Sequence, residues 1–341
     1  MQQPVVERAK EMGLWTICFA WPEGAVCKDI CDVFYPISIT EKDEILRICR
    51  EEHIDGVCTI ASDVAAPTVA YVAEKMGLAG NSYEAALRAH DKHLMREVFR
   101  DAQIPSPGFV CISKEVRGLE VRGLELPLIV KPSDRSGSLG VQKIEKWEDL
   151  EPAVTEAQRV SLAGEALIEE FIEGREISVE MISCEGTHYA LQITDKTTTD
   201  APHFVELAHH QPSSLPAEMQ ERIFAITRRA LDALGITSGA SHSEYKITKE
   251  GRIVVMEIGG RMGGDFIGSD LVRLSTGYDF LEGVIRVALG EIVHPEPKAI
   301  AHSSVEFIAP ENVTCSAERT GYIIYRNDEI YKQSIGGSAD L

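Results

Sequence analysis

The chain has 341 residues, of which 44% are hydrophobic and 26% are charged, and its formal net charge at pH 7 is −20. This length suffices for a sizeable core and for two or three domains. The acidic balance argues against non-specific binding to nucleic acid or anionic membranes, although a local cluster of Lys, Arg and backbone N–H groups can still bind a phosphate.

The sequence contains no apolar run long enough to span a membrane. The longest near the start, residues 14–21, is too short and has no basic segment before it, so we expect a cytoplasmic protein. The eight cysteines include no CxxC pair, and scattered cysteines in an intracellular chain are expected to be reduced and buried. A metal or disulfide role for Cys27 and Cys31 is the alternative.

Helical and strand-like patterns alternate along the first part of the chain. The expected elements are a helix at 4–13, strands at 14–20 and 32–37, a helix at 40–53, a strand at 55–61 and a helix at 66–77. This alternation predicts a doubly wound parallel sheet. The chain opens with a helix, so either the first strand of such a sheet is lacking or the fold simply begins with a helix.

The pattern changes after this region. We expect a helix at 83–102, a linker with two prolines at 104–109, strands at 126–132 and 141–144, a helix at 146–160, two strands within 165–183, a helix at 217–234, a hairpin at 239–260 and a β-rich tail after 290. Residues 133–140 form a polar Gly/Ser loop between two of these strands.

The hairpin at 239–260 brings two glutamates together. Its turn is 249–252, a two-residue loop centred on "EG". Counting outward, residue 247 pairs with 254, 246 with 255 and Glu244 with Glu257, whose Cβ atoms should lie about 5 Å apart. Such a pair is destabilising unless a proton or a cation lies between the carboxylates.

Two alternatives account for these glutamates: an exposed pair on a solvated sheet, or ligands of a metal ion. The apolar strand "IVVM" and the glycine-rich segment that carries Arg261 favour a buried metal site. Mg²⁺ fits best because it prefers hard oxygen ligands and few protein donors, which leaves positions for phosphate and water.

The candidate phosphate loop is residues 133–140. The chain has no GxxxxGK[ST] motif, and no GxGxxG follows a strand. The loop follows Lys131, and its hydroxyls, small residues and glycines let backbone N–H groups surround an anion. A flexible turn is the alternative, but Lys131 and the paired glutamates favour a phosphate site.

Five segments then occur in a characteristic order: Lys92 in "AHDKHLMR", "LIVKP" with its Gly/Ser loop, "LIEEFIEGREISVE", the Glu of "SHSEYK" and "MEIGGR". This order, over residues 83–290, resembles the ATP-grasp superfamily. Among its members the chain is most similar to the carboxylate–amine ligases that join amino acids, the L-amino acid ligases, and more distantly to biotin carboxylase and the purine-synthesis ligases.

The resemblance implies an α/β fold with an N-terminal doubly wound parallel-sheet domain, followed by a two-lobed ATP-grasp domain with antiparallel sheets. The implied boundaries are 1–82 for the Rossmann-like N-terminal domain, 83–110 for a linker helix and connection, 111–175 for the small lobe with its Gly/Ser lid, and 176–341 for the large lobe with the β-rich C-terminal segment.

The resemblance also implies a role for each motif residue. Glu244 and Glu257 would bind Mg²⁺, with Mn²⁺ as an alternative, and Arg261 and Lys131 would be catalytic. Arg261 would stabilise the transferred phosphoryl group and the substrate carboxylate. The residues expected to bind ATP are Lys92, Lys131, Ser133, Ser136, Gly137, Ser138, Gly140, Glu169, Glu170, Phe171, Ile172 and Glu176: the lysines and the lid bind the phosphates, 169–172 the adenine and Glu176 the ribose.

The sequence departs from the family at one position. Many members have Asn two residues after the second Glu as a further metal ligand, and this chain has Gly259. Either one metal is held more loosely, or water or another side chain completes its shell. His242 falls opposite Gly259 in the predicted register and is one candidate, with a purely structural role as the alternative.

The implied reaction is an ATP- and Mg²⁺-dependent ligation. A substrate carboxylate becomes an acyl phosphate, and an amine, that of an amino acid, then attacks it. His209, His210, Arg261 and Asp265 are the candidate substrate contacts, with a surface loop as the alternative for the histidines. Two other functions stay open: a purine-pathway or carboxylase-type enzyme, and a non-catalytic ATP-binding protein. The expected partners are small-molecule carboxylates and amines, not nucleic acid or membrane, and a homodimer is an open alternative.

Overall fold

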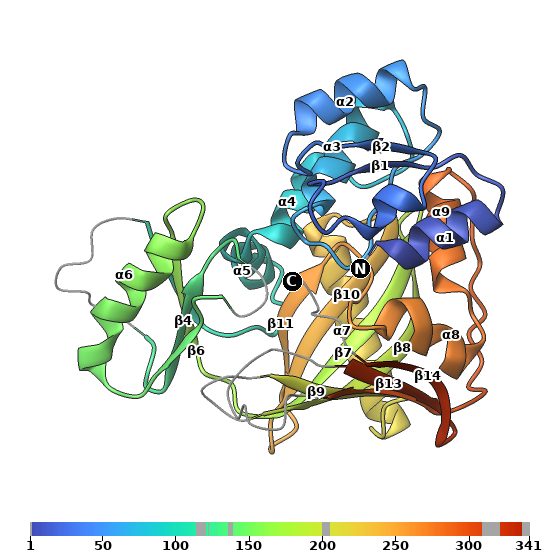
Figure 1. Cartoon of the computed structure of the whole chain (residues 1–341). Coiled ribbons are helices and arrows are strands. Elements are labelled where there is room, and N and C mark those ends of the chain that lie inside the picture. Colours follow the sequence, from blue (N-terminus) through green and yellow to red (C-terminus); the bar gives the residue numbers. More distant parts are fainter. Residues whose placement is uncertain are drawn as a thin grey trace.

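Three sheets organise the chain (Figure 1). The computed structural model describes residues 2–113, 121, 123–135, 139–199, 205–308 and 321–335. It contains a two-stranded parallel sheet near the N-terminus and two antiparallel sheets, of four and eight strands. This arrangement confirms the predicted α/β class. Within the described residues, no helix is both long and apolar enough to cross a membrane.

The N-terminal part follows the predicted alternation. Its elements are α1 (Gln3–Glu11), β1 (Ile17–Phe19), η1 (Val26–Asp29), β2 (Val33–Tyr35), α2 (Lys42–Glu51) and α3 (Ala66–Met76). β1 and β2 pair in parallel. The predicted strand at 55–61 is wrong, because this segment joins no ladder of that sheet. Ile60 makes a single parallel bridge to Met262, and the N–H of Ala61 donates to the Met262 carbonyl at 3.1 Å.

The helix predicted at 83–102 is two helices, α4 (Tyr83–His90) and α5 (Lys92–Asp101). Asp91 separates them with an extended backbone, and its carboxylate accepts the N–H of Leu94 at 2.9 Å. Aspartate is among the strongest helix N-caps because it satisfies an N–H that has no partner within the helix. The break makes Lys92 the first residue of α5.

The four-stranded sheet has the order β3-β6-β4-β5 and lies at the left of Figure 1. It comprises β3 (Phe109–Ile112), β4 (Leu128–Pro132), β5 (Gln142–Ile144) and β6 (Ala166–Glu170). The short η2 (Trp147–Asp149) leads into α6 (Leu150–Val160). One face of α6 packs on the sheet through Leu150, Ala153, Val154 and Ala157, which form a separate apolar core with Leu128, Val130 and Ile168.

The eight-stranded sheet has the order β11-β10-β7-β8-β9-β12-β13-β14. Its strands are β7 (Arg175–Cys184), β8 (Thr187–Thr198), β9 (Glu206–Gln211), β10 (Gly239–Ile247), β11 (Ile253–Gly259), β12 (Ser303–Ile308), β13 (Gly321–Arg326) and β14 (Glu329–Ile335). The predicted β-rich tail is therefore confirmed where the structure describes it. The helices of this part are α7 (Ala217–Leu234), η3 (Ile267–Leu271), α8 (Val272–Thr276) and α9 (Phe280–Ala288). Residues of α5 and α7 share the largest core with β7, β10 and β11.

The described cysteines are free, as expected. Their burial was only partly predicted, since Cys49 and Cys184 are buried while the other described cysteines are half-buried. Neither Cys27 nor Cys31 belongs to a group of three potential metal ligands among the residues the structure describes. Cys315 lies outside the described residues.

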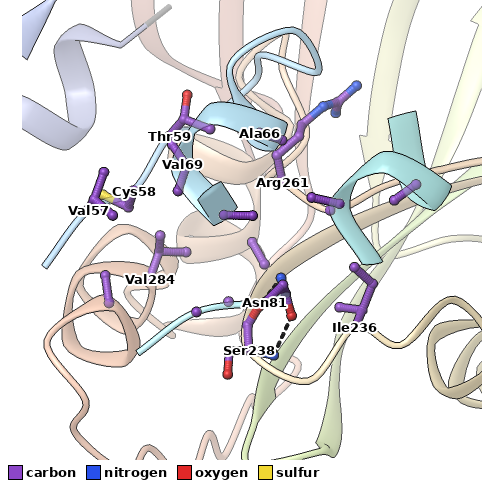
Figure 2. Close-up of a pocket in the computed structure, with 18 of the residues that line it drawn as sticks. Val57, Cys58, Thr59, Ala66, Val69, Asn81, Ile236, Ser238, Arg261 and Val284 are labelled. Carbon is purple, nitrogen blue, oxygen red and sulfur yellow. Dashed lines mark hydrogen bonds between the residues drawn. The ribbon is translucent and has the colours of Figure 1, made fainter. Parts of the chain in front are cut away.

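A pocket of about 70 Å³ lies where the N-terminal part meets α4, α9 and the end of β11 (Figure 2). Its lining is largely small and apolar and includes Ala66, Val69 and Val284. Asn81 joins two of its walls: it donates to the Ser238 carbonyl at 2.7 Å and accepts the backbone N–H groups of Thr237 at 2.8 Å and Ser238 at 2.9 Å. Asn81 therefore ties the segment before α4 to the segment before β10.

Gly174, in the connection between β6 and β7, allows a close approach of two backbones. A Cβ atom at this position would lie 2.4 Å from the Ile247 carbonyl oxygen and 2.7 Å from its carbonyl carbon. We expect Gly174→Ala to lower the free energy of unfolding by about 1–3 kcal/mol, because backbone must move to admit the methyl group. Urea unfolding measures this as a lower midpoint.

Gly108→Ala is the matched control. The nearest atom to a Cβ at Gly108 is the tip of the Leu124 side chain, Cδ2, at 3.0 Å. A side-chain tip rotates away more easily than a strand backbone moves, so the midpoint should change less. Equal midpoints for Gly174→Ala and the native protein would refute the steric argument.

Candidate active site

The two glutamates face each other as predicted. Glu244 pairs with Glu257, and His242 with Gly259, on β10 and β11. The predicted pairing nearer the turn is wrong, because residue 247 pairs with 253 and 246 with 254. The loop is one residue longer than predicted: the N–H of Thr248 donates to the Arg252 carbonyl at 3.0 Å. A bulge after Glu244 offsets this residue and restores the predicted register at the glutamates.

Each glutamate has a lysine as counter-ion. Lys92 Nζ lies 2.9 Å from Glu257 Oε1, and Lys196 Nζ lies 2.8 Å from Glu244 Oε1. The attraction of Lys196 holds the pKa of Glu244 well below its usual range. Burial by itself would lower the pKa of Lys92, but the attraction of Glu257 outweighs it and the pKa is raised. Glu244 is therefore ionised and Lys92 protonated at neutral pH.

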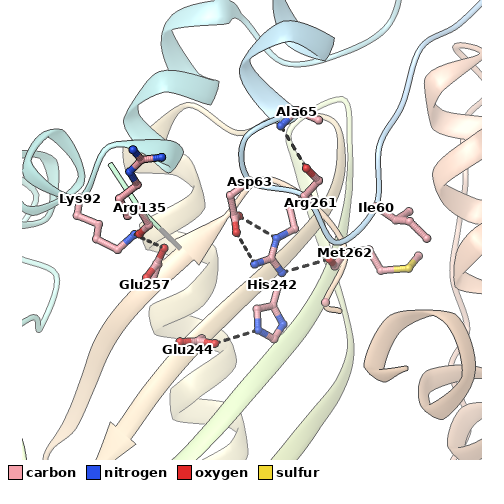
Figure 3. Close-up of polar contacts among 12 residues, drawn as sticks. Ile60, Asp63, Ala65, Lys92, Arg135, His242, Glu244, Glu257, Arg261 and Met262 are labelled. Carbon is pink, nitrogen blue, oxygen red and sulfur yellow. Dashed lines mark hydrogen bonds and ion pairs between the residues drawn. The ribbon is translucent and has the colours of Figure 1, made fainter. Parts of the chain in front are cut away.

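His242 lies between the carboxylates of Glu180 and Glu244, and Figure 3 shows its contact with Glu244. Its Nδ1 is hydrogen-bonded to Glu180 Oε1, and its Nε2 lies 3.3 Å from Glu244 Oε1. Burial lowers the pKa of His242, yet the charge of Glu180 outweighs it and raises the pKa to about 9. A protonated imidazole has no lone pair for a metal ion. These contacts favour the structural role over the ligand role for His242.

A buried ion triad lies beside the glutamates. Glu169 forms an ion pair with Arg96 Nε at 2.7 Å through one oxygen and with Lys131 Nζ at 2.7 Å through the other. Arg96 and Glu169 are 0% and 1% exposed, so both oxygens are used where water does not reach. Burial would raise the pKa of Glu169, but the attraction of Arg96 and Lys131 lowers it. The Glu169 carboxylate is thus the counter-ion of Arg96 and Lys131.

Arg96 is a site residue that the sequence reasoning missed. It follows Lys92 by four residues on α5 and therefore lies on the same face of the helix. Its guanidinium also donates to the Met256 carbonyl at 2.5 Å, next to Glu257. The four-residue spacing between Lys92 and Arg96 is the sequence signal that indicates Arg96.

Lys92 also meets the start of the candidate lid. Its Nζ donates to the Arg135 carbonyl at 2.8 Å, and its backbone N–H donates to the Ser133 carbonyl at 2.8 Å. Ser133 is fully buried. Gly140, at the far end of the loop, has a φ of +74°. Ser136, Gly137 and Ser138 lie outside the described residues.

The segment after β6 connects the two antiparallel sheets. Arg252 binds Glu170 in a bidentate manner, with Nη1–Oε1 at 2.8 Å and Nη2–Oε2 at 3.2 Å. The ring centroid of Phe171 lies 4.5 Å from Lys143 Nζ of β5 and 5.5 Å from Lys246 Nζ of β10. Lys246 also pairs with Glu176 at 3.0 Å, and Ile172 is buried. The structure therefore brings Phe171 and Glu176 together around one lysine.

Arg261 is held by an acid from the N-terminal part (Figure 3). Its Nε and Nη2 bind Asp63 Oδ1 and Oδ2, each at 2.8 Å. Burial would lower the pKa of Arg261, but the attraction of Asp63 outweighs it and the pKa is raised. Asp63 is a second residue that the sequence reasoning missed, and no local pattern indicates it.

Residues 124–270 match the family model of the ATP-grasp domain. This segment of the chain is therefore an ATP-grasp domain. Alanine–anticapsin ligase of Bacillus subtilis is 27% identical over 249 residues, which cover 65% of this chain and 51% of that protein. D-alanine–D-alanine ligase of Geotalea uraniireducens is 30% identical over 192 residues, which cover 54% of this chain and 61% of that protein.

Among solved structures, the L-amino acid ligase of Bacillus licheniformis superimposes with a TM-score of 0.77 and 25% identity, over 90% of this chain and 77% of that one. The predicted resemblance to ATP-grasp carboxylate–amine ligases is thereby confirmed. The chain spans about half the length of several curated relatives that it matches.

The candidate substrate side of the ATP-grasp domain lies at β9. His209 is fully buried, and its Nε2 lies 3.2 Å from Glu206 Oε2. A ring nitrogen of His209 and carboxylate oxygens of Glu206 and Asp265 all lie within 4.8 Å of one another. The structure thus brings His209 and Asp265 together, and Glu206 is a neighbour that the sequence reasoning missed. His210 is half-buried and points to the other face of the strand.

Proposed function

We propose that this protein is an ATP- and Mg²⁺-dependent ligase that activates a substrate carboxylate as an acyl phosphate and joins it to the amine of an amino acid. The observation that carries the proposal is the pair of facing glutamates, Glu244 and Glu257, with Lys92 beside one of them. The similarity to three ligases of amino acids supports the substrate class.

The donor set fits a hard divalent cation. Glu244 and Glu257 offer carboxylate oxygens on one face of the hairpin, and their side chains are 38% and 27% exposed, so their oxygens are partly open. These two residues would hold Mg²⁺ or, alternatively, Mn²⁺. When bound, the cation would neutralise charge on the phosphates of ATP. The remaining steps depend on the chain's own residues.

Lys92 and Lys131 would bind the phosphates. The ammonium group of Lys92 lies next to Glu257 and to the candidate lid, and that of Lys131 lies next to Glu169. Phe171 and Ile172 would contact the adenine, and Glu176 the ribose hydroxyls. Residues 133–140 would close over the phosphates and exclude water, which protects an acyl phosphate from hydrolysis. These residue roles assume the two proposed lobes, 111–175 and 176–341.

The proposed reaction has two displacements. A carboxylate oxygen of the first substrate attacks the γ-phosphorus, the bond to the β,γ-bridging oxygen breaks, and ADP leaves. The amine nitrogen of the second substrate then attacks the acyl carbon, phosphate leaves, and the amine loses a proton. Arg261 would orient the carboxylate through its planar guanidinium, and His209 with Asp265 would contact the substrates.

A phosphate-release screen with ATP, Mg²⁺ and pairs of amino acids tests the proposal. We expect ADP and phosphate in equal amounts for at least one pair, together with a new amide identified by mass spectrometry, and neither without Mg²⁺. Turnover that requires bicarbonate would favour a carboxylase-type enzyme instead. Tight ATP binding without ADP in any mixture would favour a non-catalytic ATP-binding protein.

A further inference from the structure

The space beside Glu257 where a side chain of residue 259 would lie is already filled. Residues two apart on a strand share a face, so a side chain at 259 would lie on the face of Glu257. A Cβ atom on Gly259 would lie 2.7 Å from Asp63 Oδ1 and 3.2 Å from Arg261 Nε. The carboxylate of Asp63 therefore occupies the space that a side chain of residue 259 would fill.

An ion pair with Arg261 holds Asp63 in this position. Both of its oxygens bind the Arg261 guanidinium at 2.8 Å, and its side chain is 15% exposed. Burial would raise the pKa of Asp63, but the attraction of Arg261, with smaller contributions from Lys92 and His242, lowers it. Asp63 is thus an ionised carboxylate within the field of the candidate metal and phosphate site.

The backbone around Asp63 is anchored to the end of the hairpin. Ile60 bridges to Met262, and the Ala61 N–H donates to the Met262 carbonyl at 3.1 Å. Gln2 holds the same segment, since its side-chain oxygen accepts the Ile60 N–H at 3.2 Å. These contacts hold Asp63, an acid of the N-terminal part, beside the segment that follows Gly259.

We propose that Asp63 replaces the side chain that Gly259 lacks: it supplies an oxygen donor beside Gly259, on the face of the strand that carries Glu257, toward a bound divalent cation, and it fixes the Arg261 guanidinium. This inference rests on the metal role given to Glu244 and Glu257 under the proposed function. A carboxylate has about four lone-pair sites, so a bidentate pair with arginine leaves sites for a cation or its water. Gly259 is then the residue that makes room for Asp63.

A double-mutant cycle tests whether Asp63 takes the role of a side chain at residue 259. Asp63→Ala should weaken Mn²⁺ binding about 10–100-fold, because a group that completes or orients the ligand set is lost. Gly259→Asn should also weaken it, since the new side chain collides with the Asp63 carboxylate. The double variant Asp63→Ala/Gly259→Asn should bind Mn²⁺ more tightly than either single variant, because the amide oxygen then enters the vacated space. Mn²⁺ titration in the presence of ADP, followed by electron paramagnetic resonance, measures these affinities without turnover.

Asp32→Asn is the control. Asp32 is another acid of the N-terminal part, paired with Lys10 at 2.8 Å, so its loss should lower the thermal unfolding temperature and leave the Mn²⁺ affinity unchanged. Where Asp63→Ala does not fold, Asp63→Asn keeps the shape and one oxygen and should show a smaller loss. Native Mn²⁺ affinity in the Asp63 variants, additive losses in the double variant, or no Mn²⁺ binding by the native protein would overturn the inference. A failed substrate screen would count against the ligase proposal alone, because this titration requires no substrate.

Discussion

Glu257→Gln is expected to reduce Mg²⁺-dependent ADP formation at least about 100-fold, because a metal ion contributes several kcal/mol to phosphoryl transfer and each 1.4 kcal/mol is about tenfold. The substitution keeps the shape of the side chain but replaces an anionic oxygen that faces Glu244 with a neutral amide. Lys92, 2.9 Å away, loses the charge of its counter-ion. A coupled assay of ADP release, with the substrate pair found by the screen, measures the loss.

Glu156→Gln is the matched control for this variant. Glu156 forms an exposed pair with Arg159 on α6 at 2.7 Å, and solvent screens exposed pairs of this kind. It should therefore turn over at the native rate. Circular dichroism should show the native fold in both variants. Unchanged ADP formation in Glu257→Gln would contradict the metal role.

The central pair of glutamates could be predicted because hairpin pairing is local. The turn is one residue longer than predicted, so the predicted partners of residues 246 and 247 are wrong. The bulge after Glu244 compensates for this residue, so the predicted pairing of the two glutamates is confirmed. The neighbours of Glu244 were beyond local reasoning. Lys196 reaches it from β8, which lies two strands away in the sheet, and strand order depends on contacts that are distant in sequence.

The contact of Asp63 with Arg261 could not be predicted from the sequence, for a different reason. The apolar segment 55–61 has the composition of a strand, but Met262 and the side chain of Gln2 satisfy backbone polar groups of Ile60 and Ala61 that a ladder would otherwise use. Asp63 consequently reaches Arg261, which is far along the chain. Only the docking of the N-terminal part on the large sheet brings the two together, and no spacing within the sequence encodes it.

Glu169→Gln is expected to lower the free energy of unfolding by about 3–5 kcal/mol, because removing one partner of a buried ion group leaves uncompensated charge where water cannot screen it. Arg96 and Lys131 each lie 2.7 Å from this carboxylate, and a neutral amide cannot balance both cations. The loss should be seen as a lower midpoint of urea unfolding with an unchanged slope.

The neighbouring residue provides the comparison for Glu169→Gln. Glu170 pairs with Arg252 at 2.8 Å, but the two side chains are 38% and 47% exposed, so Glu170→Gln should cost no more than about 1 kcal/mol. The pH dependence gives a second measurement. Since folding lowers the pKa of Glu169, its contribution to stability is present above the unfolded pKa of about 4.3 and is lost as the pH falls. Glu169→Gln should therefore flatten the acid side of the stability curve, and equal losses in the two variants would show that the triad does not hold this part of the site together.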